Sequence, residues 1–151
     1  MSPVELRPEQ SFASAAREVV GARSAEVFAH SSEKVLDPRR PEGVHKMRVA
    51  TRRLRAALEV FEAAFPHKRL RKSLAEVKQL AGALGERRDR DVQIELLESL
   101  RKSAGRSERH TIDDLLKELR REQALANEQL LAALEHARES ELGARLERLT
   151  E

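Results

Sequence analysis

The chain has 151 residues, a length typical of one domain, and its absence of cysteine excludes a disulfide scaffold, a thiol nucleophile and a thiolate metal site. Charged residues make up 36% of it and aromatic residues only 3%, with no Trp or Tyr, so Ala, Leu, Glu and Arg dominate and an all-α fold is predicted. Residues 39–90 hold 15 Lys and Arg against 6 Asp and Glu, whereas the other 99 residues hold 14 against 20. This asymmetry indicates an anionic partner for the middle third, although a solvated basic face would have the same composition.

Two helices are predicted in the first half of the chain. Apolar residues recur at helical spacing over residues 10–36, after Pro8. Residues 37–43 contain two prolines and a glycine and are predicted to form a loop. The second helix is expected over residues 44–65, ending before Pro66, because proline disfavours helical geometry in the residue before it.

Two more helices are predicted in the second half. One runs from His67 to about residue 102 and is followed by a turn at residues 103–107. Thr111 and Asp114 resemble a capping box that begins the next helix, which runs to about residue 137, with residues 142–149 as a terminal piece. Long helices with short connections predict an up-down four-helix bundle over residues 10–151, preceded by an extension of residues 1–9.

The longest apolar run, residues 130–134, is too short to cross a bilayer. The first five residues lack the charged-then-apolar pattern of a secretion signal. We therefore expect a soluble cytoplasmic protein.

The second predicted helix carries three stripes when its residues are placed at 100° intervals. A core stripe spans about 80° of the helix surface; it consists of Met47, Thr51, Leu54, Leu58, Phe61 and Phe65. The basic line, which presents one cation per turn, consists of His45, Arg48, Arg52 and Arg55. The small-residue strip, beyond the basic line, consists of Val49, Ala56, Val60 and Ala63. Small residues allow another helix to come close, so we expect a second helical layer here with the arginines in a groove between layers; the alternative is a chance placement of small residues on an exposed face.

No acidic residue follows within the basic line until Glu59, so we expect no i,i+4 salt bridges within this helix to neutralise it. Acids from other helices, for which Asp89 and Asp91 are candidates, could do so. Otherwise the charge is available for a ligand. Arginine's planar fork suits bidentate contacts to phosphate, and His45 could donate to a phosphate oxygen.

Two segments resemble the CHAD domain, the conserved-histidine α-helical domain. Residues 44–55, VHKMRVATRRLR, are similar to its histidine signature, and residues 84–92, LGERRDRDV, are similar to its second pattern, Leu-Gly-x-x-Arg-Asp-x-Asp-Val. Members of this family bind inorganic polyphosphate, and some associate with polyphosphate granules or are fused to triphosphate tunnel hydrolases. The resemblance implies a polyphosphate-binding set of His45, Arg48, Arg52, Arg55, Arg53, Arg88, Lys46 and Lys78.

The family domain usually has two pseudo-symmetric helical bundles with a basic channel between them, and this chain has the length of one. Neither His110 nor His136 begins a second His-x-x-Arg pattern. Either the sequence is part of a longer domain or two copies pair to rebuild the channel. We favour a homodimer with two-fold symmetry, docked through the small-residue strip.

Catalysis is not predicted, because the sequence has no Walker-type loop, no HExxH and no placeable Ser-His-Asp arrangement. No cofactor and no metal are expected. Asp89 and Asp91 could chelate a cation bound with phosphate, but are expected instead to orient arginines. A basic cluster at the start of the third helix is interpreted as a rim that steers the ligand or as a merely solvated surface; it consists of His67, Lys68, Arg69, Arg71 and Lys72.

The leading hypothesis is non-enzymatic polyphosphate binding. The alternatives are binding of a duplex nucleic-acid backbone by the same arginines, and a role as an accessory module to a phosphoanhydride-processing enzyme. Single-stranded nucleic acid is disfavoured because the chain lacks aromatic residues for base stacking.

Overall fold

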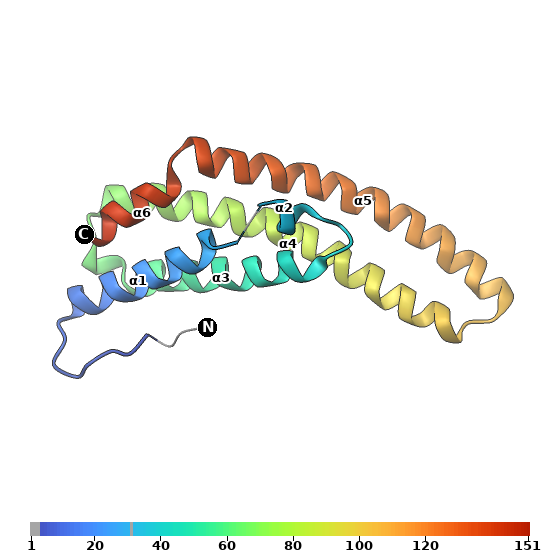
Figure 1. The fold of residues 1–151 in the computed structure, drawn as a ribbon, viewed down its shortest axis with the longest axis horizontal. Helices are drawn as coiled ribbons and strands as arrows, with labels where there is room; N and C mark the ends of the chain where they lie inside the picture. Colours follow the sequence, from blue (N-terminus) through green and yellow to red (C-terminus); the bar gives the residue numbers. More distant parts are fainter. Residues whose placement is uncertain (1–3, 31) are drawn as a thin grey trace.

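The computed structural model describes residues 4–30 and 32–151, and every regular element in these ranges is helical (Figure 1). The elements are α1 (Phe12–Phe28), α2 (Ser32–Leu36), α3 (Pro41–Val60), the 3-10 helix η1 (Glu62–Ala64), α4 (His67–Ser103), α5 (Arg106–Glu139) and α6 (Leu142–Thr150). The predicted all-α fold is therefore confirmed. The predicted up-down four-helix bundle is not, because α2 and α6 are separate helices and because α4 and α5 extend well beyond α1 and α3.

The prediction of one helix over residues 10–36 is wrong, because this range contains two helices, α1 and α2. The helix α1 begins after Ser11, whose hydroxyl accepts a hydrogen bond from the Ser14 N–H at 3.2 Å, and ends at Phe28. The short α2 then brings Val35 into the same core that Val27 reaches from α1. Residues 1–3 of the expected extension, and residue 31 within the expected helix, lie outside the described residues.

The helix α3 begins earlier and ends earlier than predicted. It begins at Pro41, inside the expected loop, because the first helical position needs no N–H donor and proline's fixed φ suits it. It ends at Val60, and the chain continues as η1. Phe61 and Phe65 were expected on the helical core stripe, but both follow the end of α3. The Phe61 ring lies against the ring of Phe12, the first residue of α1, with centroids 5.4 Å apart, and Phe65 is buried after η1.

The predicted extent of α4 is confirmed, but α5 begins five residues before the expected capping box. The Gly105 N–H donates to the Glu108 carboxylate at 2.8 Å, and this contact caps the start of α5. Thr111 and Asp114 are exposed residues inside the helix, so they cap nothing. The helix α6 follows Glu141, whose φ of 53° turns the chain back.

The apolar faces of the helices meet in one core at the end of the molecule where α1, α3 and α6 lie beside α4. Leu54, Leu58, Leu70, Leu84 and Leu146 are each at most 1% exposed there. The part of the α3 core stripe that stays helical is confirmed, since Met47 and Thr51 are also buried and the Thr51 hydroxyl donates to the Met47 carbonyl at 2.8 Å.

Beyond this core, α4 and α5 project as a two-helix hairpin (Figure 1). Along the hairpin, five large apolar side chains of α4 and α5 are exposed, namely Val92, Leu96, Leu100, Leu115 and Leu125. Ion pairs join its two helices, including Arg101 Nη2 to Asp113 at 3.1 Å and Arg120 to Glu98 at 3.0 Å. In the part of the chain that the structure describes, no helix combines the length and the apolar character needed to span a membrane.

Candidate functional site

The basic line follows one side of α3 and is open to solvent. His45, Arg52 and Arg55 are exposed and Arg48 is half-buried. The small-residue strip beside it is uncovered as well, since Val60 is 70% exposed and Ala56 and Ala63 are exposed. The second helical layer expected over this strip is therefore not supplied by the described residues.

One arginine of the basic line is already neutralised. Arg55 Nε lies 3.1 Å from Glu59 Oε1, one turn further along α3, and Lys78 Nζ from α4 lies 3.2 Å from the same oxygen. Hydrogen bonds from these two cations lower the pKa of Glu59 below its usual value. The expectation that no i,i+4 pair interrupts the line is thus wrong for Arg55.

The side chains of Arg48 and Arg52 form no hydrogen bond and no ion pair with any other described residue. The acids suggested as their partners do not pair with them: Asp89 is exposed without an ion pair among the described residues, and Asp91 is buried against Arg87. Asp91 does orient an arginine, as expected, but that arginine lies outside the basic line. Two adjacent turns of α3 therefore present uncompensated guanidinium groups.

The helix beside Arg52 and Arg55 carries glycines rather than acidic residues. The helices α3 and α4 are antiparallel, and the contact between Glu59 and Lys78 fixes their register. Stepping from that contact by four, seven and eleven residues reaches Arg55, Arg52 and Arg48 on α3. The same steps reach Gly82, Gly85 and Asp89 on α4, and no ion pair joins Asp89 to Arg48. A methyl group added to either glycine would meet nothing within 4 Å. We call this feature, the basic line together with the glycine face of α4, the trough.

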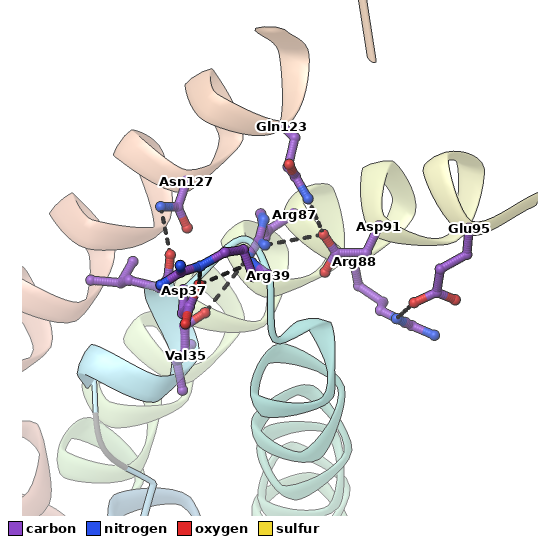
Figure 2. A network of polar contacts seen from close by, with 10 residues as sticks. Val35, Asp37, Arg39, Arg87, Arg88, Asp91, Glu95, Gln123 and Asn127 are labelled. Carbon is purple, nitrogen blue, oxygen red and sulfur yellow. Dashed lines mark hydrogen bonds and ion pairs between the residues drawn. The ribbon is translucent and has the colours of Figure 1, made fainter. Parts of the chain in front are cut away.

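Three further predicted residues are held by acids. Arg53 contacts Glu26 of α1 at 3.3 Å. Arg88 contacts Glu95 at 3.2 Å (Figure 2). Lys46 contacts Glu42 at 2.7 Å, which lowers the pKa of Glu42. The structure therefore separates the predicted set into two groups. His45, Arg48 and Arg52 have no ion pair among the described residues, whereas the other five cations each contact a carboxylate.

A buried polar network next to the trough was missed by the sequence analysis (Figure 2). The Arg87 side chain is fully buried, with Nη2 3.1 Å from Asp91 Oδ1, and the Gln123 amide of α5 donates to the same oxygen at 2.7 Å. Burial raises the pKa of Asp91 and lowers that of Arg87, because a charged group loses its hydration there. Two features of the sequence pointed to this network: the expectation that Asp91 orients an arginine, and the position of Gln123 in the apolar stripe of α5.

The same network fastens α2 to the long hairpin. Arg87 Nη1 lies 3.5 Å from the Val35 carbonyl, and the Asn127 amide donates to the Leu36 carbonyl at 3.0 Å (Figure 2). On the other side, Gly43 of α3 packs so closely on α2 that an added Cβ would lie 2.6 Å from the Lys34 carbonyl oxygen. These contacts set the position at which α3, and hence the trough, begins.

A second cationic surface lies at the start of α3, around a hollow of about 730 Å³. It is lined by Ala29, His30, Lys34, Val35, Arg39, Arg40, Pro41, Glu42, Gly43 and Lys46. Arg39 and Arg40 both contact Asp37, at 3.3 and 3.8 Å. The backbone N–H of Arg39, followed by its side chain, lowers the pKa of Asp37. This surface has less uncompensated charge than the trough.

The family model of the CHAD domain matches residues 18–151, nearly the whole chain. The chain belongs to the CHAD domain family. No curated protein and no solved structure gives a significant match. In this CHAD domain, the histidine signature forms α3 and the second motif forms the stretch of α4 that contains Gly85, Arg88 and Asp91. Among the described residues, no group of three or more His, Asp or Glu side chains is placed to hold a metal ion.

Proposed function

We propose that this protein binds inorganic polyphosphate in the trough, without catalysing a reaction on it. Membership of the CHAD domain family makes a polyphosphate-related role the starting point. The observation that carries the proposal is that the side chains of Arg48 and Arg52 have no acidic partner among the described residues. Glycines occupy the positions of α4 level with Arg52 and Arg55. Uncompensated like charges one turn apart destabilise a helix, and a bound polyanion removes that cost.

The shape of the trough favours a thin, flexible polyanion over a duplex. The axes of packed helices lie about 8–10 Å apart, so the surface that α3 and α4 share is narrower than a nucleic-acid duplex, whose major groove alone is about 12 Å wide. A polyphosphate chain can follow the arginines along α3, whereas a duplex could only cross them. Affinity would come mainly from counterion release and fall steeply with salt.

The test reverses the two unpaired charges. Arg48→Glu with Arg52→Glu is compared with Arg106→Glu with Arg109→Glu, an equal charge change on exposed residues at the tip of the hairpin. Binding of labelled long-chain polyphosphate is measured by fluorescence anisotropy over a salt series. Loss of two contacts on a single-stranded polyanion predicts at least about 25-fold weaker binding at 0.1 M salt and a shallower salt dependence; the hairpin variant should stay close to wild type.

Equal effects of the two double variants would contradict the role of the trough. Competition at equal phosphate concentration separates the candidate ligands, because displacement of polyphosphate by duplex DNA would favour the nucleic-acid alternative. Release of orthophosphate from polyphosphate in the presence of Mg²⁺ would contradict a purely binding role.

We also propose that two copies pair beside the trough. The small-residue strip on α3 is exposed, and Val92, Leu96 and Leu100 continue the glycine face of α4 as an exposed apolar row along the hairpin. A second copy on these surfaces would bury the apolar row and enclose the basic line. Sedimentation velocity should show a dimer that Val60→Asp weakens, and a monomer at high micromolar concentration would contradict the proposal.

A further inference from the structure

A separate cationic hollow of about 280 Å³ lies where α6 returns to the beginning of α4, at the end of the molecule opposite the hairpin tip (Figure 1). Its lining consists of Arg69, Lys72, Ser73, Arg145, Arg148 and Leu149. Four of these six side chains are cations, and only Leu149 is apolar. From the sequence, Arg69 and Lys72 were interpreted as part of a basic rim that steers the ligand or of a merely solvated surface.

The charge of this hollow is largely uncompensated. Arg69, Lys72 and Arg148 are exposed and have no ion pair with any other described residue. Among the described residues, the only carboxylate that forms an ion pair with the lining is that of Glu76. Its Oε2 lies 2.6 Å from Arg145 Nη2 and also accepts a hydrogen bond from the Ser140 hydroxyl at 2.6 Å. One acid therefore faces four cations.

Arg145 is itself short of acceptors. Its side chain is only 16% exposed, and its Nε and Nη1 atoms are buried without a hydrogen-bond partner among the described residues. Burial favours a raised pKa for Glu76, but the hydrogen bonds from Arg145 and Ser140 outweigh it and the pKa is lowered. Glu76 is thus firmly ionised, and it still leaves most donors of this guanidinium unsatisfied.

The size and polarity of the hollow restrict its ligand. Its volume of about 280 Å³ corresponds to about nine water molecules at about 30 Å³ each, so a compact anion such as orthophosphate or pyrophosphate fits it. A lining with one apolar side chain offers no surface for a base or an acyl chain. The guanidinium group of arginine and the ammonium group of lysine, which dominate this lining, are the side-chain groups that bind phosphoryl oxygens best.

We propose that this hollow is a binding site for a compact phosphoryl group, supplied either by a free anion such as pyrophosphate or by one end of a phosphate chain. It is distinct from the trough because Arg69, Lys72 and Ser73 lie on the side of α4 roughly opposite to Lys78, Gly82 and Gly85. The site holds its ligand by charge and hydrogen bonds alone and involves no covalent step.

The test uses sodium pyrophosphate and isothermal titration calorimetry on the full chain. Arg69→Gln with Lys72→Gln is compared with Lys68→Gln with Arg71→Gln, which removes the same charge from exposed residues of the same helical turns that do not line the hollow. The first pair should weaken binding by about tenfold or more, because it removes two charge-assisted contacts, whereas the second pair should leave binding within about twofold of wild type.

Arg148→Gln tests whether α6 contributes, since a patch confined to α4 would not respond to it. Arg48→Glu with Arg52→Glu should leave pyrophosphate binding unchanged, so failure of this site and failure of the trough are distinguishable. Equal weakening by the Arg69/Lys72 and Lys68/Arg71 pairs, or no response to Arg148→Gln, would overturn the proposal.

A second titration with short-chain polyphosphate distinguishes the two sources of the phosphoryl group. If pyrophosphate does not bind but the Arg69/Lys72 pair weakens chain binding more than the Lys68/Arg71 pair, the site holds a chain end. If neither ligand distinguishes the two pairs, there is no site in the hollow. Thermal unfolding followed by circular dichroism checks that every variant is folded.

Discussion

The buried pair of Arg87 and Asp91 gives the sharpest test of how the trough is held in place. Asp91→Ala removes the carboxylate that lies 3.1 Å from Arg87 Nη2 and accepts from Gln123 at 2.7 Å. Arg87 would keep its charge at 0% exposure, with only the Val35 carbonyl at 3.5 Å as a neighbouring acceptor. Removing one partner of a buried ion pair costs about 3–5 kcal/mol, a large part of the 5–15 kcal/mol typical of a domain.

The assay is urea unfolding followed by far-ultraviolet circular dichroism. A shift of the midpoint with an unchanged slope indicates lost stability rather than a changed unfolded state. The matched control is Asp113→Ala, which breaks the exposed ion pair with Arg101 on the same hairpin and should have little measurable effect. Both variants remove an aspartate that pairs with an arginine. The difference between their losses of stability therefore measures the effect of burial.

A double replacement separates the cost of an orphaned charge from the value of the pair. Arg87→Met with Asp91→Leu removes both charges and keeps the volume apolar, so most of the loss seen in Asp91→Ala should be recovered, since such replacements are often neutral or stabilising. A loss below about 1 kcal/mol in Asp91→Ala would refute the reasoning. So would a double variant that is no more stable than the single one.

Three further predictions follow from single contacts. Gly43→Ala should lower the free energy of unfolding by about 1–3 kcal/mol, because its Cβ would lie 2.6 Å from the Lys34 carbonyl oxygen, whereas Gly82→Ala, with nothing within 4 Å, should raise it by about 0.5–1 kcal/mol; equal urea midpoints would contradict both. Glu59→Gln should free its two cationic partners and tighten polyphosphate binding about fivefold at 0.1 M salt, and unchanged anisotropy titrations would count against the trough. The pKa of Glu76 is lower in the folded protein than its usual 4.5, so its contribution to stability is present above that value and is lost as the pH falls through the folded pKa. Glu76→Gln should therefore flatten the decline of the melting temperature between about pH 5 and pH 3, and parallel curves for the two proteins would be the contrary result.

Local patterns predicted those parts of the fold that depend on neighbours in sequence. The extent of α4 follows from Pro66 before it and the turn residues after it, and the buried side of α3 follows from its 3.6-residue period. The start of α3 at Pro41 was available from proline's preference for the first helical turn, but the two nearby prolines favoured a loop. The pair of Arg55 with Glu59 was likewise available from its i,i+4 spacing.

Contacts between distant residues could not be predicted in this way. Residues 87–91 read Arg-Arg-Asp-Arg-Asp, and nothing in that order says which arginine is buried. Arg87 is selected by the Val35 carbonyl, 52 residues earlier, and its partner Asp91 by Gln123, 32 residues later. Arg88, one position along, instead reaches Glu95 near the surface. The tertiary structure decides between chemically identical side chains.

The same argument explains why the structure narrows the predicted binding set. Arg52, Arg53 and Arg55 lie within four residues of one another, yet Arg53 contacts an acid on α1 and Arg55 contacts one on its own helix. Arg52 is left without an ion pair among the described residues because the position of α4 level with it is Gly85. A carboxylate there would have neutralised the arginine and closed the trough, and an aliphatic side chain would have covered it. Glycine does neither, so the guanidinium group of Arg52 stays exposed.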